Sequence, residues 1–161
     1  MNISEFNKCV DSFSDNLFRF LLKSVKDKAI AEDIVQDSFE VLWINSKKIK
    51  FEKAKSYLFS TGYHKMIDHI RKFKKINNIE DLQQIGKPDN EHYTDIQEIL
   101  NSAIIKLPKI QQSVILLRDY EGYSYKEIAG ITKISETQVK VYIYRARAFL
   151  KNYIIKIENL A

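Results

Sequence analysis

Two short patterns near the C-terminus pair a serine with an acid or amide three positions later. They are Ser124-x-x-Glu127 and Ser135-x-x-Gln138. At this spacing each side chain bonds the backbone N–H of the other residue, and this exchange starts an α-helix. The patterns therefore predict two successive helices, over residues 125–130 and 136–151, joined by a tight turn. That outline is typical of a helix-turn-helix, although helical proteins contain many helix pairs.

The second of these helices has two chemically different sides. Val139, Ile143, Ala146 and Leu150 recur at helical spacing and predict its buried stripe. On the other side, arginine and glutamine can form bidentate hydrogen bonds with base edges, and lysine can contact phosphates. A solvated amphipathic helix is the alternative interpretation. The residues expected to face outward are Thr137, Gln138, Lys140, Val141, Tyr144, Arg145 and Arg147.

The rest of the chain must position this helix, and its composition predicts that it does so with helices alone. Only four glycines and two prolines occur among 161 residues, and apolar residues recur at spacings of three and four. The pattern predicts an all-α protein. The expected helices cover about twenty residues from Ile3, then about 28–46 and 53–75, a short helix ending near Leu107, and 109–120 with a stop at Gly122.

A polar segment divides the helical pattern into two parts. It contains Gly86 and Pro88 among asparagines and acids, which favour turns and cannot form a core. We therefore predict two small helical domains, 1–76 and 94–161, joined by a flexible acidic linker over 77–93.

The net charge of +5 is unevenly distributed along the chain. Residues 79–100 hold six acids and one lysine, a net charge of −5, whereas 1–78 and 101–161 each carry +5. Two basic blocks on either side of an acidic connector indicate a polyanionic partner such as nucleic acid. Two solvated lysine-rich domains would give the same distribution.

Composition excludes several classes of protein. The chain has no apolar run of the roughly 20 residues that a transmembrane helix requires, and no signal-peptide core at its start. The expected location is the cytoplasm. Cys9 is the only cysteine, which excludes an intramolecular disulfide and a cysteine-based zinc cluster. We expect it to fill an apolar helix face, and we expect no catalytic residues, metal or cofactor.

The helix expected over 28–46 also has two distinct sides. Ala31, Ile34 and Phe39 are among the apolar residues on one side. Polar and acidic side chains at positions i, i+3, i+4 and i+7 fall on the other side, which we call the acidic face. It consists of Asp33, Gln36, Asp37 and Glu40.

Several strings in this order resemble the extracytoplasmic-function (ECF) sigma factors, the two-domain promoter-recognition subunits of bacterial RNA polymerase. The first block comprises Asp33-Ile-Val-Gln-Asp-Ser-Phe39 with Leu42-Trp43, then Ser56-Tyr-Leu-Phe59 and Ile67-Asp-His-Ile-Arg71. The second comprises Leu107-Pro108, Val114-Ile-Leu-Leu-Arg118, Glu121-Gly-Tyr-Ser-Tyr-Lys-Glu-Ile-Ala129, Val139-Lys140 and Arg145-Ala-Arg147. Each string alone is weak, but together they span most of the chain.

The resemblance implies a role for each surface. The acidic face with Trp43 would dock on the clamp helices of core RNA polymerase. The helix over 53–75 would melt and read the −10 promoter element, and the linker would thread toward the RNA exit path. Implied −10 contacts are Phe59, Tyr63, His64, Lys65, Arg71, Lys72, Lys74 and Lys75. Implied −35 contacts are Ser124 and Tyr125 with the outward residues Thr137 to Arg147 given above. An anti-sigma factor is an expected further partner, and no small-molecule substrate is expected.

The chain departs from the family pattern within the predicted helical string 61–64 and at the turn residue Lys133. Thr61-Gly-Tyr-His64 stands where the family usually has Ile-Ala-x-Asn, so the usual asparagine contact does not transfer to His64. Gly62 within a helix suggests a close backbone approach or a kink. Lys133 occupies a turn position where the family usually has glycine, which predicts an altered turn or a strained backbone at that lysine.

Two other functions fit parts of the sequence. A stand-alone helix-turn-helix regulator, with an N-terminal dimerisation or sensing domain, would bind duplex DNA without polymerase. An enzyme would use His64 and Asp68, at i and i+4, with His69 nearby as acid–base or metal-binding groups. No further carboxylate, cysteine or glycine-rich phosphate loop joins them, and we expect Asp68 to pair with Arg71 instead.

Overall fold

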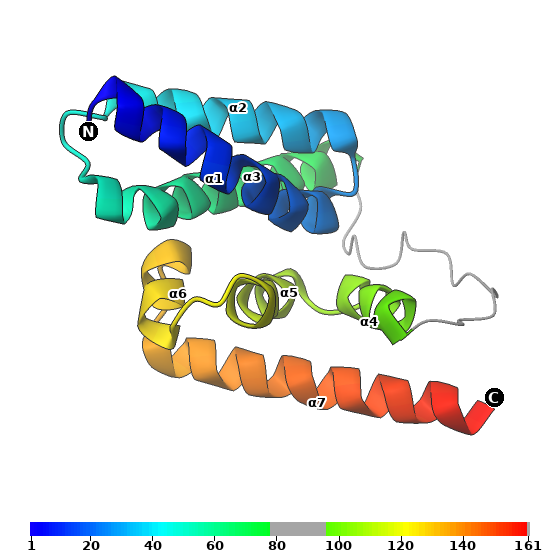
Figure 1. Ribbon diagram of the computed structural model, residues 1–161. Helices are drawn as coiled ribbons and strands as arrows, with labels where there is room; N and C mark the ends of the chain where they lie inside the picture. The colour runs from blue at the N-terminus through cyan, green and yellow to red at the C-terminus, as the bar shows by residue number, and fades with distance from the viewer. Residues whose placement is uncertain (78–95, 161) are drawn as a thin grey trace.

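The computed structural model describes residues 1–77 and 96–160, and its elements over those ranges are all helical. The first bundle contains α1 (Ile3–Val25), α2 (Lys28–Ile44), a short 3₁₀ turn (Phe51–Lys53) and α3 (Ala54–Asn77). The second contains α4 (Ile96–Ile105), α5 (Lys109–Ile115), a π-helical turn (Leu116–Tyr120), α6 (Tyr125–Thr132) and α7 (Glu136–Leu160). Figure 1 shows the two bundles lying against each other. The all-α prediction is confirmed, while the predicted acidic linker lies almost wholly outside the described residues.

Local capping explains where several helices begin. Asn2 and Glu5 form a capping box at the start of α1, and Asp27 accepts a hydrogen bond from the Ile30 N–H at the start of α2. Both boxes predicted near the C-terminus are present. The Glu127 N–H donates to Ser124 Oγ at 3.1 Å, and the Gln138 N–H donates to Ser135 Oγ at 3.1 Å. These caps define the two helices of the helix-turn-helix.

The core of the first bundle forms where α1, α2 and α3 meet. Leu17, Leu21, Leu42 and Leu58 have no exposed surface there. Gly62 of α3 lies at a close approach, because an added Cβ would come within 3.0 Å of Leu17 Cδ1 and 3.5 Å of Ser38 Oγ. The close approach to the α3 backbone that was expected at Gly62 is therefore confirmed, and the neighbour is the Leu17 side chain of α1. Cys9 is buried in the same core, as expected.

The helices of the second bundle depart from the prediction at their ends. The helix expected over 109–120 changes to a π-helical turn at Leu116, α6 continues two residues past Gly130, and α7 runs nine residues beyond Lys151. Helix α7 packs against α4, and just after α4 the Lys106 ammonium lies 4.7 Å from the centre of the Tyr153 ring, beyond the predicted end of α7. A contact with a residue distant in sequence therefore accompanies the extension of α7 past its predicted end.

Lys133 ends α6 in the left-handed conformation, with φ 59° and ψ 34°. A residue with a Cβ is strained there, whereas glycine is not. The backbone strain expected at Lys133 is therefore confirmed. We expect Lys133→Gly to increase the free energy of unfolding by about 1 kcal/mol. Urea unfolding followed by circular dichroism measures it.

Gly122 provides the matched control, because its φ is +75° and an added Cβ would meet no atom within 4 Å. Gly122→Ala should therefore lower the free energy of unfolding by about 1 kcal/mol through backbone strain alone. A loss of stability in Lys133→Gly would contradict the interpretation of this turn.

Candidate functional site

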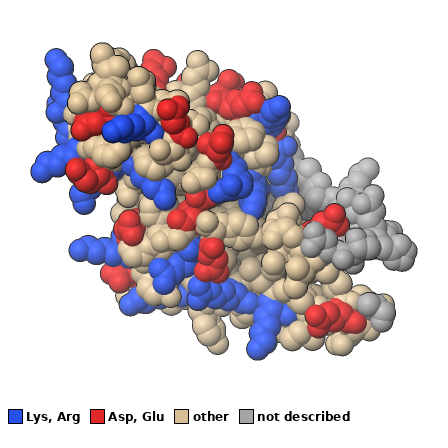
Figure 2. Space-filling model, viewed as in Figure 1, with Lys and Arg blue, Asp and Glu red and all other residues tan. Residues whose placement is uncertain are grey.

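The outward side of α7 forms the first candidate surface, and it is open to solvent. Thr137, Gln138, Lys140, Val141, Tyr144 and Arg145 are all exposed, and we call them the reading face. Tyr144 is 75% exposed, a high value for an aromatic side chain. Figure 2 shows basic side chains along α7. The reading face therefore presents hydrogen-bond donors, a ring and cations at the start of a helix, an arrangement that suits entry into a major groove.

Arg147 lies beside the reading face but already has a partner. Its Nη2 donates to Asp119 Oδ1 at 2.7 Å, and its Nε donates to Asp119 Oδ2 at 3.3 Å. This hydrogen bonding raises the pKa of the Arg147 guanidinium further. The pair joins α7 to the π-helical turn, so Arg147 helps to orient the helix. Sequence reasoning missed Asp119, because no spacing rule relates positions 28 residues apart.

The π-helical turn also supports the start of α6. Arg118 donates from Nη1 to the Tyr123 carbonyl at 2.9 Å, and its guanidinium lies 4.4 Å from the centre of the Tyr125 ring. Tyr125 and Ser124 are half-buried. Tyr125 lies beside the reading face, because the Lys140 ammonium is 5.7 Å from the centre of its ring, and both residues are less exposed than that face.

We predict that the Asp119–Arg147 pair has a measurable coupling energy. Both side chains are partly exposed, 39% and 50%, so the coupling should be about 1 kcal/mol rather than the larger value of a buried pair. A double-mutant cycle of Asp119→Ala and Arg147→Ala, followed by urea unfolding, measures it. Glu136 and Lys140 are the control, because that pair is single-contact, 3.8 Å apart and similarly exposed. Equal coupling in the two pairs would contradict the orienting role of Asp119.

The acidic face of α2 forms the second candidate surface. Asp33, Gln36, Asp37 and Glu40 are all exposed, as predicted. Trp43 is 45% exposed, and its ring packs against Phe6 of α1 with centroids 5.0 Å apart. Ile3, Phe6, Phe39 and Trp43 line a shallow apolar groove beside Glu40. Acids beside an apolar groove suit a partner helix that carries both basic and apolar side chains.

The third candidate surface, on α3, is only partly open. Two of the implied −10 contacts, Phe59 and Tyr63, are buried in this structure, 0% and 6% exposed, so neither ring has a free face on its surface. Phe59 packs between Phe20 of α1 and Tyr123 of the second bundle, with centroid distances of 5.7 Å and 5.4 Å. Burial also raises the pKa of the Tyr63 phenol.

Other predicted residues of α3 remain accessible. Arg71, Lys72 and Lys75 are exposed, and His64, Lys65 and Lys74 are half-buried. His64 Nδ1 lies 2.7 Å from the Ser60 carbonyl oxygen.

The residues considered for acid–base or metal chemistry have separate partners. Asp68 pairs with Arg71 at 3.9 Å, as predicted, while His64 contacts the Ser60 carbonyl. Within residues 1–77 and 96–160, no three His, Cys, Asp or Glu side chains are grouped as a metal site would require.

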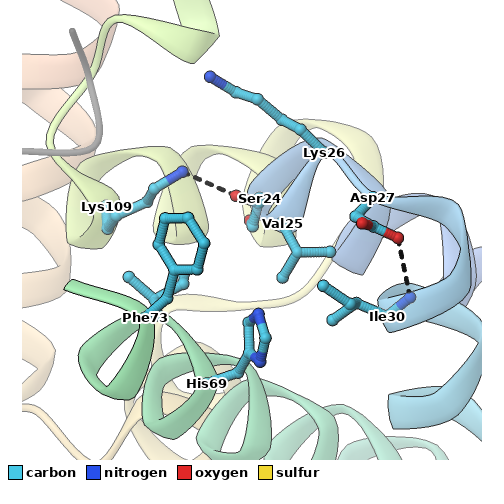
Figure 3. Close-up of a pocket in the computed structure, with 9 residues that line it drawn as sticks. Ser24, Val25, Lys26, Asp27, Ile30, His69, Phe73 and Lys109 are labelled. Carbon is cyan, nitrogen blue, oxygen red and sulfur yellow. Dashed lines mark hydrogen bonds between the residues drawn. The ribbon is translucent and has the colours of Figure 1, made fainter. Parts of the chain in front are cut away.

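A cavity of about 270 Å³ lies where the two bundles meet. Figure 3 shows Lys109 of α5 reaching across to Ser24, with His69 and Phe73 rising from α3 on the other side. Lys109 Nζ donates to the Ser24 carbonyl at 2.8 Å. The cavity therefore borders the contact between the bundles.

Comparisons with known proteins agree with this arrangement. Residues 9–76 match the family model of sigma-70 region 2, and residues 97–150 match that of sigma-70 region 4. The ECF RNA polymerase sigma factor SigM of Bacillus subtilis (strain 168) is 33% identical over 144 residues, covering 86% of this chain and 88% of SigM. The RNA polymerase sigma factor SigV of the same organism is 29% identical over 151 residues, covering 92% and 90%.

A solved structure has a similar fold. It is the sigma factor RpoE of Bartonella quintana, crystallised with the anti-sigma factor NepR. The two chains are 21% identical and superpose with a TM-score of 0.75, over 94% of this chain and 98% of RpoE.

The chain belongs to the ECF family of RNA polymerase sigma factors. It is a promoter-recognising initiation factor whose partners are core RNA polymerase and promoter DNA. The relatives favour this function over a stand-alone helix-turn-helix regulator. None of the helices described for 1–77 and 96–160 has the length and apolar character of a membrane span.

Proposed function

We propose that the two bundles divide promoter recognition between them. The domain of residues 1–76 docks on core polymerase and engages −10 DNA, and the domain of residues 94–161 reads the −35 duplex. The observation that carries this proposal is the reading face, six neighbouring exposed side chains on a capped helix whose opposite stripe is buried. We assign base contacts to Gln138, Tyr144 and Arg145 and phosphate contacts to Lys140.

The acidic face and Trp43 are the proposed docking surface for core polymerase. The three exposed carboxylates of Asp33, Asp37 and Glu40 steer a basic partner, and the half-exposed indole offers an apolar anchor beside them. On α3, we assign −10 contacts to His64 and Lys65 and to the cations near its C-terminal end, which would hold the displaced backbone. Those cations are Arg71, Lys72, Lys74 and Lys75.

Two further properties belong to the same proposal. RpoE of Bartonella quintana was crystallised with an anti-sigma factor, and we expect a protein of that kind to bind this chain too. We also propose that the chain has no catalytic activity of its own and acts in the cytoplasm, because the polymerase supplies the chemistry of RNA synthesis there.

Transcription in vitro with bacterial core polymerase tests the proposal. The template is a fragment pool of the genome that encodes this chain, and the readout is RNA starting at defined positions. We expect defined starts only when the chain is added to core polymerase. RNA that is identical with and without the chain would refute the proposed function.

A further inference from the structure

The cavity where the two bundles meet has an apolar lining with room for a small molecule. Its apolar side chains are Val25 of α1, Ile30 of α2, and Ile70 and Phe73 of α3. Its volume is about 270 Å³, whereas a cavity of about 150 Å³ already holds a benzene ring. The His69 and Phe73 rings of α3 are stacked, with centroids 6.5 Å apart and an interplanar angle of 29°. The lining therefore suits a flat aromatic body of one or two rings.

Ser24 brings a polar group to this cavity that has no partner. The residue is 4% exposed, and its hydroxyl is buried without a hydrogen bond to any described residue. Its carbonyl, in contrast, accepts a hydrogen bond from Lys109 Nζ at 2.8 Å. A buried hydroxyl without an acceptor costs free energy, and an acceptor on a ligand would remove that cost. The Ser24 hydroxyl thus indicates a ligand that carries a hydrogen-bond acceptor.

The charges around the cavity are predominantly positive. Lys26, just after α1, and Lys109 of α5 both line it (Figure 3). Lys26 forms no ion pair within residues 1–77 and 96–160, and partial burial lowers the pKa of its ammonium. Asp27 is the one acid among the described lining residues, and its Oδ1 accepts from the Ile30 N–H at 3.1 Å. Two lysines against one aspartate favour an anionic ligand.

We propose that the cavity binds a small aromatic carboxylate. Its rings lie against Val25, Ile30 and Phe73, and its carboxylate accepts hydrogen bonds from the Ser24 hydroxyl and the Lys26 ammonium. Apolar pockets with a few polar groups are common ligand sites where domains meet. None of the lining residues belongs to the reading face, the acidic face or the proposed −10 contacts. The proposal is therefore independent of the promoter roles, and it can be tested on the chain alone.

Titration of the purified full chain, followed by amide NMR, tests the site. The probe is 2-naphthoate, and 2-naphthalenemethanol is its uncharged analogue. We expect 2-naphthoate to bind with a dissociation constant below about 1 mM, a modest affinity for a ligand of this size, and the alcohol to bind at least fivefold more weakly. Amide shifts should be largest within 24–30 and 69–73. No binding of 2-naphthoate, equal binding of acid and alcohol, or shifts centred elsewhere would overturn the proposal.

Ser24→Ala tests the hydroxyl. It removes the unpaired group but keeps the carbonyl that Lys109 contacts, so 2-naphthoate should bind at least threefold more weakly with no fall in Tm. Ser113→Ala is the matched control, because the Ser113 hydroxyl is also buried without a partner among the described residues but does not line the cavity. Its affinity for 2-naphthoate should equal that of the parent. The same loss in both variants, or in neither, would overturn the proposed contact.

Lys26→Gln tests the charge, and it decides the matter if Ser24→Ala does not fold. It should weaken 2-naphthoate binding at least threefold and change binding of the alcohol by less than twofold. Lys28→Gln removes the same charge two residues away, from an exposed lysine that pairs with Glu32 at 4.0 Å and does not line the cavity. We expect parental affinity in Lys28→Gln. An equal effect of the two variants would show attraction by overall charge alone and would overturn the proposed site.

Discussion

Trp43→Ala should weaken binding to core RNA polymerase about 30-fold, equivalent to about 2 kcal/mol, which is typical of a central aromatic anchor. The indole is 45% exposed and packs on Phe6 with ring centroids 5.0 Å apart, so it presents a rigid apolar surface beside the acidic face. Its loss removes contact area but no charge. Fluorescence anisotropy of a labelled chain titrated with core polymerase measures the change.

Phe149→Ala is the matched control for Trp43→Ala. Phe149 is also a partly exposed aromatic, at 38%, but it lies on α7 in the other bundle. We expect its polymerase affinity to change by less than threefold. If Trp43→Ala binds as tightly as the parent, with its fold intact by circular dichroism, the docking surface has been assigned to the wrong place.

The second large effect is expected for Arg145→Ala, which should weaken binding to the preferred −35 duplex by about 1 to 3 kcal/mol and relax base preference at one position. Arg145 is exposed on the reading face, whereas its neighbour Arg147 is held by Asp119. Selection from a randomised duplex library, followed by sequencing of the bound fraction, gives both the affinity and the preference.

Lys140→Ala distinguishes base reading from phosphate contact. Lys140 pairs loosely with Glu136, 3.8 Å away, and is assigned to the backbone of DNA. Its loss should weaken binding to all duplexes alike and reduce the salt dependence. If Arg145→Ala has that same uniform effect, Arg145 does not read a base.

Features set by neighbours along the chain could be predicted from sequence. The Ser124 and Ser135 capping boxes and the left-handed Lys133 follow from local backbone chemistry. The acidic face and the reading face follow from the helical period, because each helix has a single buried stripe.

Features set by distant neighbours could not be predicted. The period shows that Phe59 and Tyr63 share a side of α3, but it does not show that Tyr123 covers Phe59 there. The same limit applies to the length of α7, whose Tyr153 contacts Lys106, and to the Asp119–Arg147 pair. For the −10 contacts, then, residue type indicated the chemistry while tertiary packing decided which residues are accessible.

Mapping of transcription start sites tests the central claim most directly, the claim that each domain reads one promoter element. Core polymerase is combined with the parent chain, Arg145→Ala or His64→Ala on the same genomic fragment pool, and RNA 5′ ends are sequenced. We expect parental starts to share one motif near −35 and one near −10. Arg145→Ala should relax only the first motif, and His64→Ala only the second. The claim that each domain reads one element would be contradicted if the parental starts share no upstream motif. It would also be contradicted if either variant relaxes both motifs.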